Sequence, residues 1–175
     1  MCNQHQEPEL QLSLPGVDDT LRLGQELARG ILRLGQCPCI ILLQGELGAG
    51  KTTLIRGLTQ ALPGGQQAQV SSPSFNIMNV YPTDPEVLHL DLYRLSGPEA
   101  AESLWENLAQ DYQGILLVEW SENLPVQEYP EQYYLLHLRR QGPGRTAQLL
   151  AIGCRLEPLI DKVQHSGLNI LEKGE

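Results

Sequence analysis

Lysine is scarce in this 175-residue chain, which has only three, and acidic residues outnumber basic ones to give a formal net charge of −9. Proteins that bind nucleic acid unaided hold its phosphates mainly with lysine and arginine. An acidic chain is therefore a poor candidate for gripping nucleic acid alone, although a protein partner can still bring it into a nucleic-acid process.

Long apolar runs are also missing. No stretch approaches the about 20 residues that a membrane-spanning helix requires. The start of the chain, Met1 to Glu9, is polar and acidic, which does not fit a secretory signal. We therefore expect a cytoplasmic protein with no membrane association. We also expect residues 1–9 to be disordered.

Cysteine is limited to four residues, whose spacing matches no zinc-binding or redox motif. Disulfides are rare in cytosolic proteins. We therefore expect buried or incidental thiols at Cys2, Cys37, Cys39 and Cys154.

Hydrophobic patterning predicts strands that alternate with helices. Polar and apolar residues alternate from Leu10 to Leu14, and apolar residues recur at helical spacing from Leu23 to Leu34. Two nearly all-apolar runs, Cys39 to Leu43 and Ile115 to Val118, are typical of strands buried on both faces. A turn at Gly142 to Gly144 indicates a C-terminal hairpin. The other expected strands cover 76–81, 87–92, 133–139 and 146–152, and the other expected helices begin near 54, 96 and 156.

A glycine-rich segment lies between the first all-apolar strand and a helical pattern. Gly45 to Thr52 matches G-x-x-x-x-G-K-[ST] at every fixed position. Glycines let the backbone wrap a phosphate without side-chain clashes, and the loop amides and the following helix start point at the anion. Lys51 would bridge the outer phosphates, and the Thr52 hydroxyl would bind Mg²⁺. The motif predicts ATP and Mg²⁺ as ligands, with the nucleotide held by Gly45, Glu46, Leu47, Gly48, Ala49, Gly50, Lys51, Thr52 and Thr53.

The order of the expected elements defines a fold class. Strands alternating with helices are typical of an α/β protein with parallel strands at the centre of its sheet, and the hairpin adds antiparallel strands. We predict a single domain over residues 1–175 with a three-layer P-loop NTPase fold. Its central sheet would be mixed and mainly parallel, with a C-terminal antiparallel hairpin, and residues 156–175 would form a closing helix and tail.

Two carboxylates follow predicted strands, where P-loop proteins take a metal ligand. They are Glu119, after the second all-apolar strand, and Asp91. Strand alternation places Asp91 on the same side of its strand as His89, which suits a hydrogen-bonded structural role. From the residues alone, it stays open which carboxylate binds metal and which positions water. It also stays open whether Glu119 is an exposed strand end and whether Asp91 makes a structural salt bridge, for example with Arg94.

Four blocks, in this order and spacing, resemble the TsaE (YjeE) family over about residues 10 to 155. They are the loop Gly45 to Thr53, Ser72-Pro73-Ser74-Phe75, His89-Leu90-Asp91-Leu92-Tyr93-Arg94-Leu95 and Glu119-Trp120-Ser121-Glu122. The resemblance implies a small bacterial ATPase, weakly active alone, which acts with TsaB and TsaD in making the threonylcarbamoyl modification on the tRNA adenosine beside the anticodon. In that family TsaD performs the transfer, so tRNA would contact this chain only indirectly.

The resemblance also implies roles for individual residues. Thr52 and Glu119 would hold magnesium, and Asp91 would lie near the terminal phosphate as a catalytic residue together with Lys51. The segment Ser72, Pro73, Ser74 and Phe75 would act as a switch.

Some positions keep more than one interpretation. Ser74 stands where the family usually has threonine; it keeps the hydroxyl but lacks the methyl group. Arg94 can face a phosphate, a partner protein or a carboxylate of this chain. Tyr93, Trp120 and Glu122 are further candidates for contact with a partner or a phosphate, although Trp120 suits packing better than stacking on a nucleotide.

Two other functions are compatible with the motifs. A small-molecule kinase of the same fold would need an acceptor pocket and often an arginine-bearing lid. After Trp120 the candidates for such a lid are Arg139, Arg140, Arg145 and Arg155. A non-catalytic scaffold would bind ATP only to present an interface, but the presence of both strand carboxylates argues against it.

Overall fold

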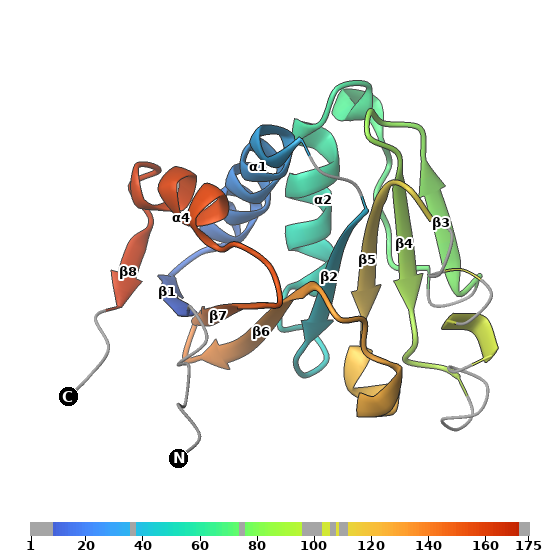
Figure 1. Ribbon diagram of the computed structural model, residues 1–175. Helices are drawn as coiled ribbons and strands as arrows, with labels where there is room; N and C mark the ends of the chain where they lie inside the picture. The colour runs from blue at the N-terminus through green and yellow to red at the C-terminus, as the bar shows by residue number, and fades with distance from the viewer. Residues whose placement is uncertain are drawn as a thin grey trace, which may run out of the picture.

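The computed structural model describes residues 9–35, 38–73, 76–95, 103–105, 108 and 112–171. Its eight strands form one sheet in the order β3-β4-β5-β2-β6-β7-β1-β8 (Figure 1). The strands are β1 (Glu9–Leu14), β2 (Cys39–Gln44), β3 (Met78–Tyr81), β4 (Val87–Asp91), β5 (Ile115–Glu119), β6 (Tyr133–Gln141), β7 (Gly144–Ile152) and β8 (Asn169–Leu171). The helices are α1 (Val17–Leu34), α2 (Lys51–Ala61) and α4 (Glu157–Gln164), with short 3-10 turns η1 (Gly65–Gln67), η2 (Ser121–Asn123) and η3 (Val126–Glu128).

The centre of the sheet is parallel and its two sides are antiparallel. β2 pairs in parallel with both β5 and β6, and β4 pairs in parallel with β5. β3 adds an antiparallel edge beside β4, while β7, β1 and β8 continue the sheet antiparallel beyond β6. The predicted mixed sheet with a parallel centre and a C-terminal hairpin is therefore confirmed.

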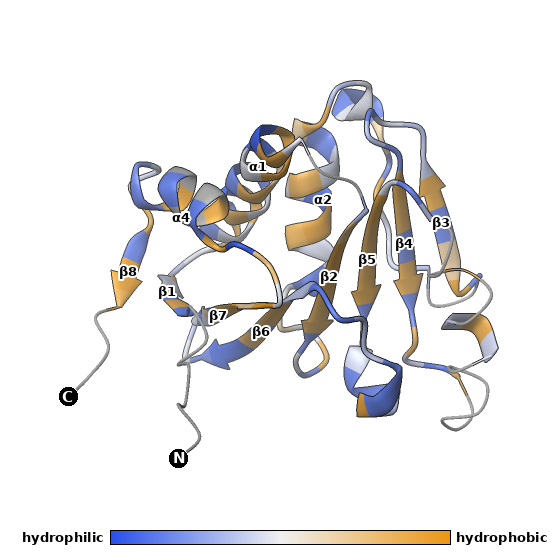
Figure 2. Cartoon of the chain, viewed as in Figure 1, coloured by the Kyte–Doolittle hydropathy of each residue, from blue (hydrophilic) through white to orange (hydrophobic). Residues whose placement is uncertain are grey.

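The fold has three layers, because the central strands turn apolar side chains to both faces of the sheet and both faces are covered. In β2, Ile41 and Leu43 join a large apolar cluster beneath α1, α2 and α4, whereas Ile40 and Leu42 join a second cluster on the other face. That second cluster also contains Trp105 and Leu124 from the segments that cover it. Figure 2 shows that the central strands are hydrophobic along their length, as burial on both faces requires.

Helices α1 and α2 pack closely through two glycines. A Cβ atom at Gly24 would lie 2.2 Å from the carbonyl oxygen of Leu54, and one at Gly57 would lie 2.2 Å from that of Leu21. Only glycine, which has no side chain, allows the backbones of the two helices to lie this close together. The packing holds α2 against the rest of the fold and so fixes the position of its first residues.

The predicted closing helix is present as α4, but each end of the chain also contains strand residues that the sequence did not predict. Residue 9 was expected to be disordered with residues 1–8, but Glu9 begins β1 and pairs with Leu150. The expected C-terminal tail contains β8, which pairs with β1 at residues Gln11 to Ser13; three residues are too few to show an alternating pattern. Residues 1–8, the predicted helix start at 96–99, Cys37 and residues 172–175 lie outside the described residues.

No helix in the described ranges is both long enough and apolar enough to span a membrane.

Candidate functional site

The glycine-rich loop joins the carboxyl end of β2 to the first residue of α2. Gly50 has a φ of 105° and precedes the helix without any side-chain cap, so the first amides of α2 are available to a ligand. Gly45, with a φ of 139°, lies so close to β6 that a Cβ atom there would be 2.1 Å from the carbonyl oxygen of Leu138. The loop therefore has the conformation and the free amides that an anion requires.

A cleft of about 550 Å³ opens over this loop. It gathers residues that are far apart in the sequence, because the carboxyl ends of parallel strands meet at one edge of the sheet. Its lining consists of Leu47, Gly48, Gly50, Lys51, Thr52, Thr53, Ser72, Asp91, Tyr93, Arg94, Glu119, Trp120 and Arg145.

Lys51 is only 4% exposed and lies folded into the loop. Its ammonium group donates hydrogen bonds to the backbone oxygens of Gly45 and Glu46, the second at 3.2 Å, and lies 3.8 Å from the centre of the Trp120 ring. Burial lowers the pKa of Lys51 below its ordinary value, against the opposing effect of the nearby carboxylates. These carboxylates belong to Glu119, Glu122, Asp91 and Glu46. A phosphate entering the loop would give this cation a stronger partner than the two backbone oxygens.

Thr52 and Glu119 form a pair of oxygen ligands at the start of α2. The Thr52 hydroxyl donates to Oε1 of Glu119 at 2.7 Å, and Glu119 is 3% exposed, so it is not a solvent-exposed strand end. The ring of buried His89 lies behind it, with Nε2 3.0 Å from the same carboxylate oxygen. A hydroxyl and a carboxylate fit Mg²⁺, which prefers oxygen ligands and usually takes only one or two from the protein. The expected structural hydrogen bond of His89 is confirmed.

Asp91 stands beside Glu119 because their strands pair in register. It is 3% exposed; one carboxylate oxygen accepts a 2.6 Å hydrogen bond from the Ser72 hydroxyl, and the other accepts one from the Tyr93 amide at 3.0 Å. These bonds fix the direction of a carboxylate that lines the cleft. They also connect the segment containing Ser72 and buried Pro73 to the site; Ser74 and Phe75 lie outside the described residues.

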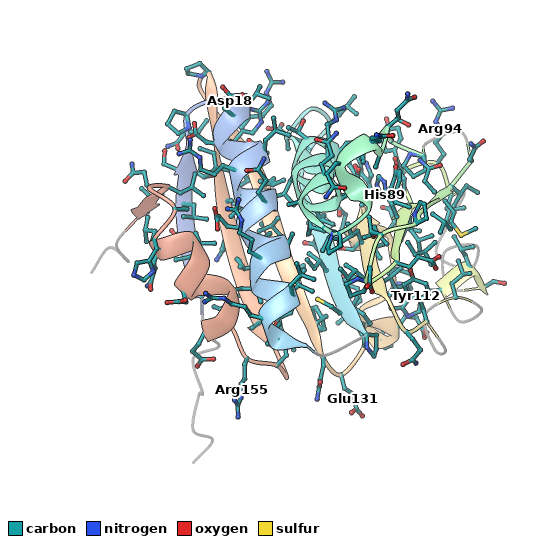
Figure 3. The ribbon with its side chains drawn as sticks, turned by 90° about the horizontal axis from the view of Figure 1, so that it is seen from above. Asp18, His89, Arg94, Tyr112, Glu131 and Arg155 are labelled. Atoms are coloured by element: carbon teal, nitrogen blue, oxygen red, sulfur yellow. The ribbon has the colours of Figure 1, made fainter. Side chains whose placement is uncertain are left out.

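Of the remaining predicted residues, Tyr93, Arg94 and Trp120 line the cleft, whereas Glu122 is not part of its lining. Trp120 has a left-handed backbone, with a φ of 59°, and its ring lies 4.7 Å from that of Tyr93. Tyr93 and Arg94 are exposed, and Figure 3 shows Arg94 at the periphery of the molecule. Glu122 faces the loop, because its carboxylate accepts a long, 3.5 Å hydrogen bond from the Gly45 amide.

The sequence named Arg145 only as one of four candidates for a kinase lid and did not predict its contact with the glycine-rich loop. This residue comes from β7, near the turn of the hairpin, and lies against Gly50: a Cβ atom on that glycine would be 2.9 Å from Nε of Arg145. The turn residues Gly142 to Gly144 predict a hairpin, but nothing in the local sequence indicates which loop the hairpin approaches.

Comparison with known proteins identifies a family for this chain. The family model described as "Threonylcarbamoyl adenosine biosynthesis protein TsaE" matches residues 14–147. The tRNA threonylcarbamoyladenosine biosynthesis protein TsaE of Synechocystis sp. is 43% identical over 125 residues, 68% of this chain and 74% of that protein. The protein of the same name from Haemophilus influenzae is 34% identical over 140 residues, 79% of this chain and 87% of the relative.

A solved structure shares the fold. The crystal structure of Bacillus subtilis YdiB superposes with a TM-score of 0.69 and 24% sequence identity, covering 94% of this chain and all of that one. The likeness supports the predicted P-loop fold class, with its mixed α/β sheet.

Proposed function

Because this chain belongs to the TsaE family of threonylcarbamoyladenosine biosynthesis proteins, we propose that it binds ATP with Mg²⁺ in the cleft and hydrolyses the nucleotide. It would do so as the accessory subunit of TsaB and TsaD, in the pathway that makes the threonylcarbamoyl modification of the tRNA adenosine beside the anticodon. The observation that carries the proposal is the meeting of Thr52, Glu119 and Asp91 at the start of α2, within one cleft.

Each of these residues would have a separate role in phosphoryl transfer to water. Thr52 and Glu119 would hold Mg²⁺, which supplies charge neutralisation when bound. Lys51 and the loop amides would bind the outer phosphates, and Asp91 would orient the attacking water and receive its proton. Since little covalent chemistry falls to the protein in such reactions, this positioning accounts for most of the expected rate enhancement.

The bond from Ser72 to Asp91 supports a switch role for the segment that begins at Ser72. Loss of the terminal phosphate would change the surroundings of Asp91 and release this segment, which would alter affinity for the partner proteins. The net charge of −9 supports contact with tRNA through the partners rather than directly.

The test is ATP turnover by wild type, Asp91→Ala and Glu119→Ala in the presence of TsaB and TsaD. Each variant should lose about 100-fold or more in turnover, while the exposed Glu131→Ala, at the opposite end of the molecule, should match wild type (Figure 3). Unchanged turnover in both site variants would remove the assignment.

Product analysis separates the competing functions. Free phosphate as the product supports an ATPase, whereas a phosphorylated metabolite would identify a kinase. Absence of ATP cleavage in a single turnover of the assembled complex would identify a scaffold.

A further inference from the structure

The hairpin of β6 and β7 forms one wall of the nucleotide cleft. β6 contacts the loop at Gly45, whose backbone lies against the carbonyl of Leu138, and at Glu46, whose carboxylate accepts a 3.2 Å hydrogen bond from the Arg140 amide. β7 adds Arg145, which lies against Gly50 and lines the cleft. The hairpin is thus in direct contact with the loop at three points.

Arg145 carries an unsatisfied donor. Its Nε is buried and has no hydrogen-bond partner among the described residues, and none of the ion pairs found there includes its guanidinium group. Buried polar groups are nearly always hydrogen-bonded in folded proteins. A donor in this state beside a cleft indicates an acceptor that arrives with a ligand.

The strand order gives the direction from which Arg145 approaches. β4 and β5, which end in Asp91 and Glu119, lie on one side of β2, whereas β6 and β7 lie on its other side. The loop that follows β2 is therefore between the two carboxylates and Arg145. If the terminal phosphate lies near the carboxylates, the nucleoside end of the nucleotide extends toward Arg145.

We propose that Arg145 binds the α-phosphate, at the nucleoside end of ATP and ADP, and sets the affinity for both nucleotides rather than the rate of hydrolysis. This inference rests on the proposed function, because it requires a nucleotide in the cleft. The guanidinium group suits the role, since its planar fork of donors can bind two phosphate oxygens together.

The experiment compares wild type, Arg145→Ala and Arg145→Lys by calorimetric titration with ADP and with ATP in Mg²⁺, and by steady-state turnover. Arg145→Ala should raise the Kd for ADP and for ATP by the same factor, about tenfold or more, and raise KM while kcat stays within about threefold. Arg145→Lys should recover part of the affinity. The control is Arg22→Ala, an exposed arginine on α1 outside this cleft, which should match wild type.

The possible outcomes separate this inference from the proposed function. An unchanged Kd in Arg145→Ala would overturn the inference about Arg145. A fall in kcat with no change in Kd would also overturn it, because that result would place the guanidinium group at the terminal phosphate. A lower thermal midpoint of Arg145→Ala without ligand, with normal affinity, would make the residue structural and would also overturn it. If the alanine variant does not fold, Arg145→Gln carries the same expectations. Failure of wild type to bind any nucleotide would instead overturn the proposed function together with this inference.

Discussion

The hydroxyl of Thr52 donates a 2.7 Å hydrogen bond to the carboxylate of Glu119, although the two residues are 67 positions apart in the sequence. The pair joins the first turn of α2 to the end of β5. It places two side-chain oxygen groups of the type that Mg²⁺ prefers within one cleft.

Replacing Glu119 by Gln should weaken the magnesium dependence of nucleotide binding. The amide keeps the size of the side chain but is a weaker ligand for a hard cation than a carboxylate. We expect Mg²⁺ to lower the Kd for ADP in wild type, and the factor by which it lowers the Kd should be smaller by about tenfold or more in the variant. Titration calorimetry with and without Mg²⁺ measures both factors. Glu131→Gln, which changes an exposed carboxylate, is the matched control. An equal response to Mg²⁺ in wild type and Glu119→Gln would exclude Glu119 as a ligand.

Trp120 should report nucleotide binding through its fluorescence. The Lys51 ammonium group lies 3.8 Å from its ring centre, and a phosphate in the loop would draw that cation away from the ring. Adding ADP should therefore change the tryptophan emission of wild type, and Trp120→Phe should lose most of that change. Trp105, the other tryptophan, packs in the cluster with Leu116 and Val118, so Trp105→Phe should keep the response. A response lost in Trp105→Phe and kept in Trp120→Phe would contradict the arrangement at the cleft.

Cys154 should be slow to alkylate. Burial raises the pKa of its thiol, which donates a 3.3 Å hydrogen bond to the backbone oxygen of Tyr133. A raised pKa leaves less of the reactive thiolate at a given pH below that value. The alkylation rate at Cys154, followed by peptide mass spectrometry, should reach half its maximum at a higher pH in the native protein than in urea. Because the folded state holds this proton more tightly, the stability that the neutral thiol contributes should also be lost as the pH rises through the raised pKa. A half-maximum at the same pH in both conditions would refute the shift.

The local sequence was sufficient to predict the glycine-rich loop and the strands at the centre of the sheet. The all-apolar runs at 39–43 and 115–118 predict buried strands, and those strands pair in parallel. The pattern from Gly45 to Thr52 specifies both a loop conformation and a following helix, so its place between β2 and α2 could be predicted from the residues themselves.

Local sequence patterns could not predict which residues of different strands lie opposite one another. That Asp91 stands opposite Glu119 depends on how β4 aligns with β5, and that alignment is set by packing between residues distant in the chain. The same applies to Arg145, whose hairpin reaches the loop only because β6 pairs with β2. The sequence indicates the turn of the hairpin but not its neighbour.

Gly24→Ala should destabilise the protein although alanine is the better helix former. Alanine gains about 1 kcal/mol over glycine inside a helix, but its Cβ would lie 2.2 Å from the carbonyl oxygen of Leu54. Because the obstacle is the backbone of α2, the helices must move apart, and overpacking of this kind costs about 1–3 kcal/mol. We therefore expect a lower free energy of unfolding in urea without nucleotide, while Arg22→Ala, at an exposed position of α1, should stay within about 0.5 kcal/mol of wild type.

Adding Gly57→Ala tests whether the two glycines act on the same contact. The second Cβ would meet the carbonyl of Leu21 at 2.2 Å, on the facing side of the same helix pair. Once the first substitution has separated the helices, the second has less to displace, so the double variant should lose less stability than the sum of the single losses. Since α2 begins at Lys51, the same displacement should also weaken ADP binding. A Gly24→Ala variant as stable as wild type would mean that helix propensity outweighs the contact and that these glycines do not set the spacing of α1 and α2.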